Sequence, residues 1–412
     1  MDPDTGRDEV IDILVVDQDI EAIGSIEAKS EMNVIDATGK LVMPGIVDLH
    51  VHLRDMEQSH KETIETGTKA ARKGGVTTVF TMPNTNPPLD SAENIKKYLD
   101  LIKGNARVDT HIVGAITKEQ LGKELADIDI YPEFNIRFIS DDGFDIDDAD
   151  LLKKAYEKAN SLDLTIMTHP EIHSIAPKGV INEGKVSEKL GVEGQPNKKE
   201  WQAIERGVKI ALEVKAKAHF THISTLDSVK LLRDAKKLSH LITCDATPHH
   251  FCLTEDEVLK QGSMAKVNPP LRTKDDRLAI IEGIKDGTID AIVTDHAPHA
   301  ENEKTDDLIR SAFGFSELEV MLPASITELH YNQKIDLMKV ISLLTIQPAR
   351  LANLRVGRLQ VGFPADITIV DLNEEHEVDR NKFVSKGKNT PFHGKKLKGW
   401  PVMTIVKGAV YK

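Results

Sequence analysis

The sequence predicts a closed (β/α)8 barrel of TIM type, an α/β fold, accompanied by a small β domain. Eight short β-branched or apolar runs recur through the middle of the chain, and amphipathic stretches with charged faces separate most of them. Both ends of the chain are β-rich and show no helical period. Alternating strand and helix patterns require a parallel sheet with crossover helices, and eight units exceed the usual count of about six in an open doubly wound sheet.

The eight strand candidates share a short apolar core that is followed by polar residues. They begin at Gly45 (GIVDLHVHL), Thr77 (TTVFTMP), Thr110 (THIVGAI), Asn135 (NIRFISDD), Leu164 (LTIMTH), Ala218 (AHFTHIS), Leu241 (LITCDATPHH) and Ala291 (AIVTDHAPH). Residues 148–162 illustrate the stretches between them, because Leu152, Ala155 and Ala159 share one side at helical spacing. This stretch is therefore predicted to be a helix that packs on the sheet.

The two ends of the chain have a different pattern. Residues 11–37, 355–372 and 402–412 are alternating or β-rich, with Gly and Asp at the turns. No one of these segments has enough strands to be stable alone. We therefore expect one composite β domain of residues 1–43 and 351–412 beside a barrel of residues 44–350.

Composition limits the classes of partner. The chain has 53 Lys and Arg against 66 Asp and Glu, a formal net charge of −13, which argues against a nucleic-acid binder because such a protein needs a basic face. The first ten residues lack the pattern of a signal peptide, and no apolar run is long enough to span a bilayer. Two cysteines are too few for a disulfide framework. We expect a cytoplasmic protein without nucleic-acid or membrane partners.

Side chains that bind metals end several of the predicted strands. His50 and His52 are two residues apart and so share one face of the first strand, while His169, His222 and Asp295 lie at the ends of the fifth, sixth and eighth. Catalytic groups of such barrels lie at the C-terminal ends of the strands. Imidazoles and a carboxylate that converge on one rim need a cation, and the set suits zinc or a similar first-row divalent ion.

Five ligands exceed what one catalytic zinc usually takes, which suggests two ions about 3.5 to 4 Å apart with a bridging anion between them. The acidic pair Asp141 and Asp142, in FISDDG at the end of the fourth strand, can provide that anion. One of the two has an alternative role in a turn or as the N-cap of the next helix. The residues alone leave this choice open.

Six sequence motifs follow one another in the same order as in a known enzyme family. They are DLHVHLRD at 48–55, MPNTNPP at 82–88, THIST at 221–225, TPHH at 247–250, NPPLR at 268–272 and TDHAPH at 294–299. Together with GRLQVGFPADITIVDL at 357–372 and NTPFHG at 389–394, they resemble the dihydroorotase family of zinc amidohydrolases. Hydantoinases, dihydropyrimidinases and allantoinases share the H-x-H and the barrel, but MPNTNPP, NPPLR and DHAPH are more similar to dihydroorotase.

The resemblance implies the reversible hydrolysis of the cyclic amide of (S)-dihydroorotate to N-carbamoyl-L-aspartate in de novo pyrimidine (UMP) biosynthesis. It implies attack by zinc-bound hydroxide, with Asp295 as the general acid and base. It assigns His50, His52 and Asp295 to one zinc, and His169 and His222 to the other. Many relatives bridge the ions with a carbamylated lysine, but RFISDD contains none and resembles the branch in which the second Asp, here Asp142, is the bridge. Occupancy of the second zinc site stays open.

Arg54 lies two residues beyond His52 and so on the same side of an extended segment, where its planar fork can grip a substrate carboxylate. The resemblance assigns Asn84 and His299 to the same carboxylate, Asn268 to the ring amides, and the backbone around Phe313 and Gly314 to further contacts. Either asparagine taken alone would also suit a turn before Pro. The full expected substrate-binding set is His52, Arg54, Asn84, Asn268, His299, Phe313 and Gly314.

Two other functions remain to be weighed against this one. A hydantoinase, dihydropyrimidinase or allantoinase would act on a different cyclic amide, and assays with the different substrates would separate them. A barrel that has lost catalysis and serves only as an assembly partner would lack metal ligands, whereas all four histidines and Asp295 are present. A homo-oligomer, or association with another enzyme of the pyrimidine pathway, is compatible with the sequence.

Overall fold

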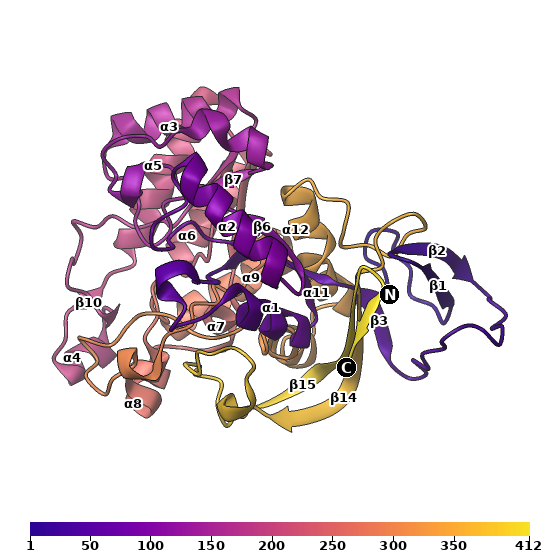
Figure 1. Ribbon diagram of the computed structural model, residues 1–412. Helices are drawn as coiled ribbons and strands as arrows, with labels where there is room; N and C mark the ends of the chain where they lie inside the picture. The colour runs from indigo at the N-terminus through magenta and orange to yellow at the C-terminus, as the bar shows by residue number, and fades with distance from the viewer.

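All eight predicted runs contain a strand in the computed structural model, which describes residues 1–412 (Figure 1). Each strand is short, and all but the half-buried β6 are almost wholly buried, as expected for a parallel sheet covered by helices. The strands are β4 (Ile46–Val51), β5 (Val76–Thr81), β6 (Asp109–Ile112), β7 (Phe138–Ile139), β8 (Thr165–Thr168), β11 (Ala218–Phe220), β12 (Ile242–Ala246) and β13 (Ala291–Ile292).

The strands close into a ring. Strands β4, β5 and β6 form one parallel sheet, and β7, β8, β11, β12 and β13 form a second in this order. A parallel bridge between Gly114 and Ile139 joins the two sheets at one seam, and a bridge between Val51 and His296 joins them at the other. At the second seam, His52 N–H also donates to the carbonyl of His296 at 2.8 Å. The predicted TIM-type barrel is confirmed.

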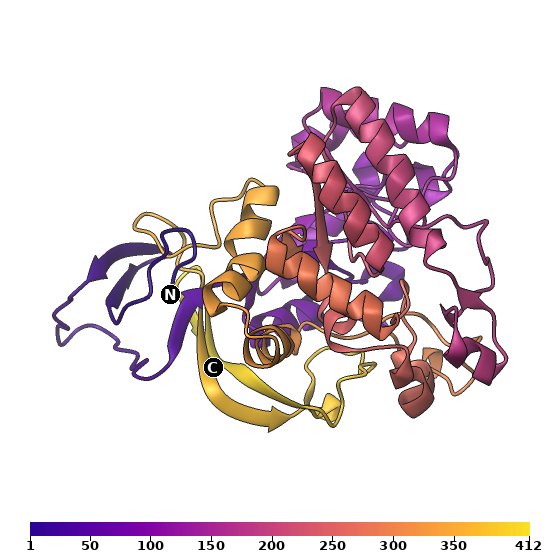
Figure 2. The same cartoon turned by 180° about the vertical axis from the view of Figure 1, so that it is seen from behind.

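Helices cover the outside of the ring, and Figure 2 shows several of them packed side by side on the far face. The longer ones are α1 (Ile64–Lys73), α2 (Ala92–Asn105), α3 (Ala149–Ser161), α5 (Lys198–Val214), α6 (Leu226–Leu238), α9 (Lys274–Asp286) and α11 (Leu337–Leu344). Helix α3 begins after Asp148, whose carboxylate caps it, and buries Leu152, Ala155 and Ala159 as predicted. None of the helices combines the length and apolar composition that crossing a membrane requires.

Shorter elements fill the loops. They are α4 (Lys185–Leu190), α7 (Pro248–Cys252), α8 (Asp256–Gln261), α10 (Met321–Ser325), α12 (Ile346–Leu351), the π-helical η6 (Ile326–Asn332), and the small strands β9 (Ile181–Asn182) and β10 (Gly194–Gln195). The 3-10 turns are η1 (Met56–Gln58), η2 (Lys118–Gln120), η3 (Ile128–Phe134), η4 (Gly262–Ala265), η5 (Glu301–Glu303) and η7 (Arg380–Lys382). Only 3-10 turns lie between β6 and β7, so this unit of the barrel lacks a long helix.

Both ends of the chain build the small β domain. Strand β3 (Leu41–Pro44) pairs with β14 (Ile367–Glu377) in an antiparallel sheet that continues through β15 (Lys396–Val406) to β16 (Ala409–Tyr411). The hairpin β1 (Asp12–Val16) and β2 (Asp19–Gly24) projects beside this sheet (Figure 1). The composite β domain is confirmed, while the boundaries at residues 44 and 350 stay a prediction.

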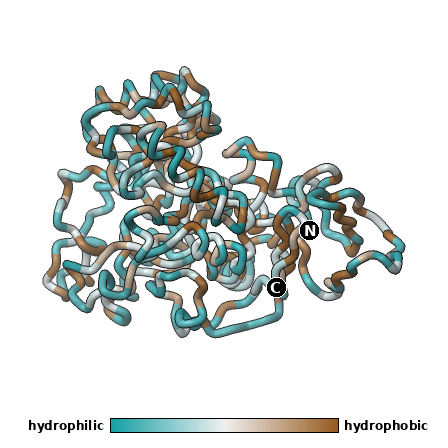
Figure 3. The backbone as a smooth tube through the Cα atoms, in the orientation of Figure 1, coloured by the Kyte–Doolittle hydropathy of each residue, from teal (hydrophilic) through white to brown (hydrophobic).

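Gly45 connects the β domain to the barrel. Its N–H donates to the carbonyl of Asp366 at 2.8 Å, and a Cβ atom at this position would lie 2.1 Å from Thr77 Oγ1. Only glycine permits this close approach. The main hydrophobic core contains 60 buried residues, and in Figure 3 hydrophobic segments alternate with hydrophilic ones along the helices. The strand ends that carry the polar residues are therefore held by a rigid, packed scaffold.

Candidate metal centre

The C-terminal ends of the barrel strands bring the six predicted metal ligands together, and all six are buried. They are His50 and His52 at β4, Asp142 after β7, His169 after β8, His222 after β11 and Asp295 after β13. The ligand atoms of five of them form two groups of three, each within 4.8 Å: one contains His50 and His52, the other His169 and His222. Asp142 belongs to both groups, so it lies where a bridge between two ions would have to lie.

The distances place Asp142 at the middle of the cluster. Its Oδ1 lies 3.2 Å from His50 Nε2 and 3.6 Å from His169 Nδ1, and its Oδ2 lies 3.4 Å from His52 Nε2. Asp295 approaches from the other side, with Oδ1 at 3.0 Å from His52 Nε2 and 3.5 Å from His50 Nε2. Every predicted metal ligand is thus close to at least one other.

Asp141 points away from this cluster. Its Oδ1 accepts hydrogen bonds from the N–H groups of Ile116 (2.8 Å) and Thr117 (3.0 Å), and the Thr117 hydroxyl donates to its Oδ2. Burial raises the pKa of Asp141 to about 6. Of the two adjacent aspartates, one therefore holds a loop and the other enters the cluster.

The charges of the cluster oppose the effect of burial. Burial would raise the pKa of Asp142 and Asp295, but the surrounding imidazoles hold the first well below its usual range and the second at about 2. Burial would lower the pKa of His50, but Asp142 and Asp295 raise it to about 9. For His169, burial is outweighed in the same way by Asp142 and Glu171, and the pKa is about 10. Two buried carboxylates are thus ionised at neutral pH and attract positive charge.

The donor set fits a metal ion. His50 Nε2 and Asp142 Oδ1 are both buried, and neither has a hydrogen-bond partner. They lie 3.2 Å apart, but this contact is not aligned as a hydrogen bond. Unpaired buried polar atoms are costly unless they meet a ligand. Imidazole nitrogens and carboxylate oxygens are the ligands that zinc and similar divalent ions take.

Neighbouring side chains fix which nitrogen of each strand-β4 histidine is free. His50 Nδ1 lies 2.8 Å from Thr221 Oγ1, and the Thr221 hydroxyl donates its only proton to Asp245 at 3.1 Å. Thr221 therefore accepts a hydrogen bond from His50 Nδ1, which leaves His50 Nε2 to face the cluster. His52 Nδ1 lies 2.8 Å from the acceptor Oδ1 of Asn84, which leaves its Nε2 to the cluster in the same way.

Asn84 contacts the metal-ligand cluster with both ends of its amide. Besides accepting from His52, it donates through Nδ2 to Asp142 Oδ2 at 3.1 Å. The resemblance placed Asn84 on the substrate carboxylate. In the structure its amide contacts His52 and Asp142, and a contact with the substrate stays a prediction.

Arg54 is buried without a partner. Its side chain makes no hydrogen bond and no ion pair, its Nε is an unpaired buried atom, and the residue is only 9% exposed. Burial lowers the pKa of the guanidinium, while the charges of Asp295 and Asp142 oppose this. Arg54, His222 and Asp295 also have positive φ angles of 53°, 40° and 49°. Residues other than glycine rarely adopt this backbone conformation, and those that do cluster at functional sites.

Asn268 reaches the cluster through Glu171. Its Nδ2 donates to Glu171 Oε2 at 2.6 Å and lies 3.1 Å from His169 Nε2, so its Oδ1 remains available to accept from a ligand. The other oxygen of Glu171 accepts from Lys199 at 2.7 Å. Burial alone would raise the pKa of Glu171, but His169, His173 and Lys199 hold it well below its usual range. Glu171 thus aligns both a metal ligand and a substrate candidate.

His299, Phe313 and Gly314 lie together. His299 Nε2 donates to the carbonyl of Phe313 at 2.7 Å, while its buried Nδ1 makes no hydrogen bond and lies 3.5 Å from Glu303 Oε2. Burial, and then the charge of Arg54, lowers the pKa of His299 to about 3, so the ring is neutral. Gly314 has a φ of 127°, and a Cβ atom there would lie 2.6 Å from Cβ of Ala297. The chain at this position therefore requires glycine.

Sequence reasoning missed three residues that support the site. Glu171 follows His169 by two positions, Asp245 lies inside β12, and Asn389 lies in the motif NTPFHG. All three are buried polar side chains. An acidic residue within an apolar strand is a signal that could have found Asp245, because an unpaired buried charge is costly.

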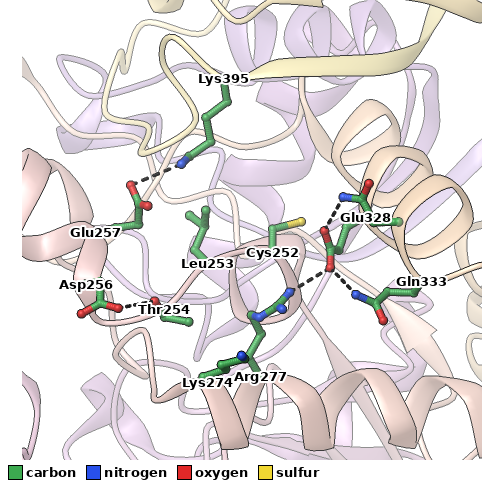
Figure 4. A pocket seen from close by; sticks show the side chains of 11 residues that line it. Cys252, Leu253, Thr254, Asp256, Glu257, Lys274, Arg277, Glu328, Gln333 and Lys395 are labelled. Atoms are coloured by element: carbon green, nitrogen blue, oxygen red, sulfur yellow. Dashed lines mark hydrogen bonds and ion pairs between the residues drawn. The ribbon is translucent and has the colours of Figure 1, made fainter.

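A separate polar crevice of about 510 Å³ lies beside α7 and α8 (Figure 4). Four of its charged side chains form ion pairs, Arg277 with Glu328 at 2.8 Å and Lys395 with Glu257 at 3.3 Å. Cys252, which lines it, is a single thiol whose pKa burial raises. None of the metal-ligand residues lines this crevice.

Comparisons with known proteins agree with the geometry. The profile described as "Amidohydrolase family" matches residues 41–410. The dihydroorotases of Bacillus cereus (strain B4264) and Bacillus thuringiensis (strain Al Hakam) are each 43% identical over 405 residues, which cover 98% of this chain and 95% of each relative.

Solved structures of the same fold include an L-hydantoinase (dihydropyrimidinase) from Arthrobacter aurescens, with a TM-score of 0.87 and 26% identity over 97% of this chain and 92% of that chain. The dihydropyrimidinase from Brevibacillus agri NCHU1002 has a TM-score of 0.86 and 20% identity over 97% and 91% of the two chains. At that identity, the second likeness bears on the fold alone.

Proposed function

The chain belongs to the amidohydrolase family, and the relatives named above are dihydroorotases. From this membership we propose how its residues hydrolyse a cyclic amide. The substrate is (S)-dihydroorotate and the product is N-carbamoyl-L-aspartate, in the reversible step of pyrimidine biosynthesis. The proposed metal ligands and Asp295 would supply the metal-binding and acid/base groups that such a reaction needs.

Arg54 is the observation that carries this choice of substrate. A buried guanidinium without an ion pair is costly, and it stands beside the cluster with its planar fork unused. Dihydroorotate has a carboxylate on its ring, whereas hydantoin, dihydrouracil and allantoin have none. A carboxylate bound at Arg54 would satisfy the guanidinium and would hold the ring on the side of Asp295 and Asp142, whose charges act on Arg54.

Two zinc ions fit the proposed division of the ligands. His50, His52 and Asp295 would hold one, His169 and His222 the other, and Asp142 would lie between them. When bound, the metal polarises the amide carbonyl and lowers the pKa of water to about 7.

Asp295 moves the proton. Its pKa of about 2 keeps it ionised, so its carboxylate can accept a proton from the attacking water and return it to the departing ring nitrogen. Its Oδ1 lies 3.0 Å from His52 Nε2, so the proposed base stands beside the proposed metal ligands of β4. In ring closure the same carboxylate acts in the opposite order.

The remaining groups orient the ring. Asn268 donates to Glu171 through Nδ2 and has Oδ1 free, which could accept from a ring N–H. His299 Nδ1 makes no hydrogen bond, and a carboxylate bound at Arg54 would favour protonation of the ring, which would let Nδ1 donate to that carboxylate. Phe313 and Gly314 form the wall beside His299.

One experiment tests the proposal directly. The purified protein is assayed in both directions with dihydroorotate and carbamoyl aspartate, beside hydantoin, dihydrouracil and allantoin, while its metal content per chain is measured. We expect turnover of dihydroorotate and about two zinc ions. Preference for a substrate without a carboxylate would contradict the proposal. Light scattering of the same preparation tests association into a homo-oligomer.

A further inference from the structure

Asn389 is a buried side chain from the C-terminal part of the chain, and it uses its full hydrogen-bonding capacity. It is 2% exposed. Its Nδ2 donates to the carbonyls of Ala297 (3.0 Å) and Gly314 (2.9 Å). Its Oδ1 accepts from the N–H of His299 and from Ser316 Oγ, both at 3.1 Å. Two donors and two acceptor positions are all that an asparagine amide has, so nothing remains for solvent.

These contacts close the base of one loop. Residues 297–299 lead into the loop and residues 314–316 lead out of it, and Ala297 N–H donates to the carbonyl of Phe315 at 2.7 Å. Ser316 N–H also donates to the main-chain carbonyl of Asn389 at 2.6 Å. The loop carries His299 and Phe313. Asn389 therefore fixes the spacing between its two ends.

The segment that carries Asn389 is itself held against the barrel. Glu62, just before α1, accepts from the N–H of Lys386 at 3.2 Å and from the hydroxyl of Ser385. At Gly387 a Cβ atom would lie 2.6 Å from Cβ of Pro298, so the segment approaches the loop as closely as glycine allows. Asn389 thus enters the loop from a fixed support.

We propose that Asn389 is a positioning residue for substrate recognition. It sets the main chain at His299 and Gly314, and so the side of the pocket that faces the substrate carboxylate, although it touches neither substrate nor metal. The proposal rests on the proposed function, because it takes His299, Phe313 and Gly314 as substrate contacts. It makes the C-terminal segment part of the machinery that selects a carboxylate-bearing ring.

The Asn389→Asp variant tests this with little change in volume. An oxygen replaces Nδ2 and faces the carbonyls of Ala297 and Gly314, so two donated bonds are lost and repulsion takes their place. The matched control is Asn381→Asp, the same substitution at an exposed position of the same C-terminal segment, whose side chain bonds only Asp379. Ser316→Ala removes one of the four bonds and serves as the milder variant if the first does not fold.

The readouts are KM and kcat for dihydroorotate, zinc per chain, and amide hydrogen exchange of residues 300–313 in the metal-free protein. We expect Asn389→Asp to raise KM about tenfold with kcat changed less than about threefold, zinc content unchanged, and exchange in the loop faster. Ser316→Ala should change KM in the same direction by less, and Asn381→Asp should match the wild type.

An unchanged KM in both Asn389→Asp and Ser316→Ala, or a loss of zinc in step with activity, would overturn the proposal. The exchange measurement needs neither metal nor substrate. If the wild type fails to turn over dihydroorotate, the proposed function is wrong. Faster exchange in Asn389→Asp would then still support the positioning of the loop by Asn389. Unchanged exchange would overturn the positioning role as well.

Discussion

Asp295 Oδ1 lies 3.0 Å from His52 Nε2, although 243 residues separate them in the chain. The two residues follow β13 and β4, which meet where the barrel closes, and the bridge between Val51 and His296 lies directly beside them. The proposed acid/base group and the first metal ligands are therefore built on the seam of the barrel. The pairing of β4 with the segment after β13 therefore both closes the barrel and brings His52 and Asp295 together.

Replacing Asp295 with Asn should nearly abolish turnover and leave the fold intact. The amide cannot accept the proton of the attacking water, and loss of a general acid/base typically costs a factor of about 10² to 10⁴ in rate. The measurements are kcat for dihydroorotate and the circular dichroism spectrum of the variant. Near-normal activity in a folded variant would show that Asp295 has another role.

Replacing Arg54 with Lys should weaken substrate binding. The ammonium keeps the charge but loses the planar fork, and a lost charge-assisted hydrogen bond costs about 1.5 to 3 kcal/mol, so KM for dihydroorotate should rise roughly 10- to 100-fold. Any slow hydrolysis of dihydrouracil, which has no carboxylate, provides the control and should not change. An unaltered KM would rule out contact between Arg54 and the substrate.

Replacing Thr221 with Val should weaken metal binding. The isosteric side chain can neither accept from His50 Nδ1 nor donate to Asp245, so the tautomer of His50 is no longer fixed. Removing such a partner of a metal ligand typically costs 10- to 100-fold in affinity. Competition with a chelator measures the zinc affinity, and Thr221→Ser, which keeps the hydroxyl, should restore it. Equal affinities in both variants would contradict the role of the hydroxyl.

The adjacent aspartates should behave differently. Asp142→Asn should reduce the zinc bound per chain, because a neutral amide replaces the carboxylate shared by both ligand groups. Asp141→Asn should keep the zinc, since Asp141 holds the N–H groups of Ile116 and Thr117 instead. Elemental analysis of the two purified variants makes the comparison. The opposite result would assign the bridge to Asp141.

Asp366 should make the β domain less stable as pH rises. Burial raises its pKa to about 6, while in the unfolded chain the carboxyl releases its proton near 3.8. Between these values the folded state binds more protons, so the free energy of unfolding falls with rising pH. The shift of about two pKa units corresponds to roughly 3 kcal/mol.

The neutral variant Asp366→Asn tests this linkage. It can still accept the N–H of Lys407 through its oxygen. Urea unfolding of both proteins at pH 4, 5, 6 and 7 should show the variant gaining stability relative to the wild type across this window. A constant difference between the two proteins would show that Asp366 does not titrate in this range.

Local patterns in the sequence predict much of this molecule. The eight strands follow from short apolar runs, and the metal ligands follow from where those runs end, because parallel strands bring their C-terminal ends to one rim. Even β7 and β13, with two residues each, are found in this way. The composite β domain follows from the same kind of pattern at the two ends of the chain.

Contacts between distant segments are not predictable in this way. Whether Asp141 or Asp142 enters the cluster depends on the direction of consecutive side chains, which alternate and cannot be assigned without the register of the strand. The partners of Thr221 and Asn389 come from other strands and loops, so no spacing along the chain reveals them. Asn84 illustrates the same limit, because its partners His52 and Asp142 lie on other segments of the chain.

The pairing of β3 with β14 has a consequence for synthesis of the protein. Residues 41–44 leave the ribosome more than 300 residues before their partner strand at 367–377. Throughout that interval β3 exposes an unpaired edge directly in front of the first barrel strand. Such an edge can pair with other chains, so we expect the nascent protein to depend on chaperones until β14 emerges.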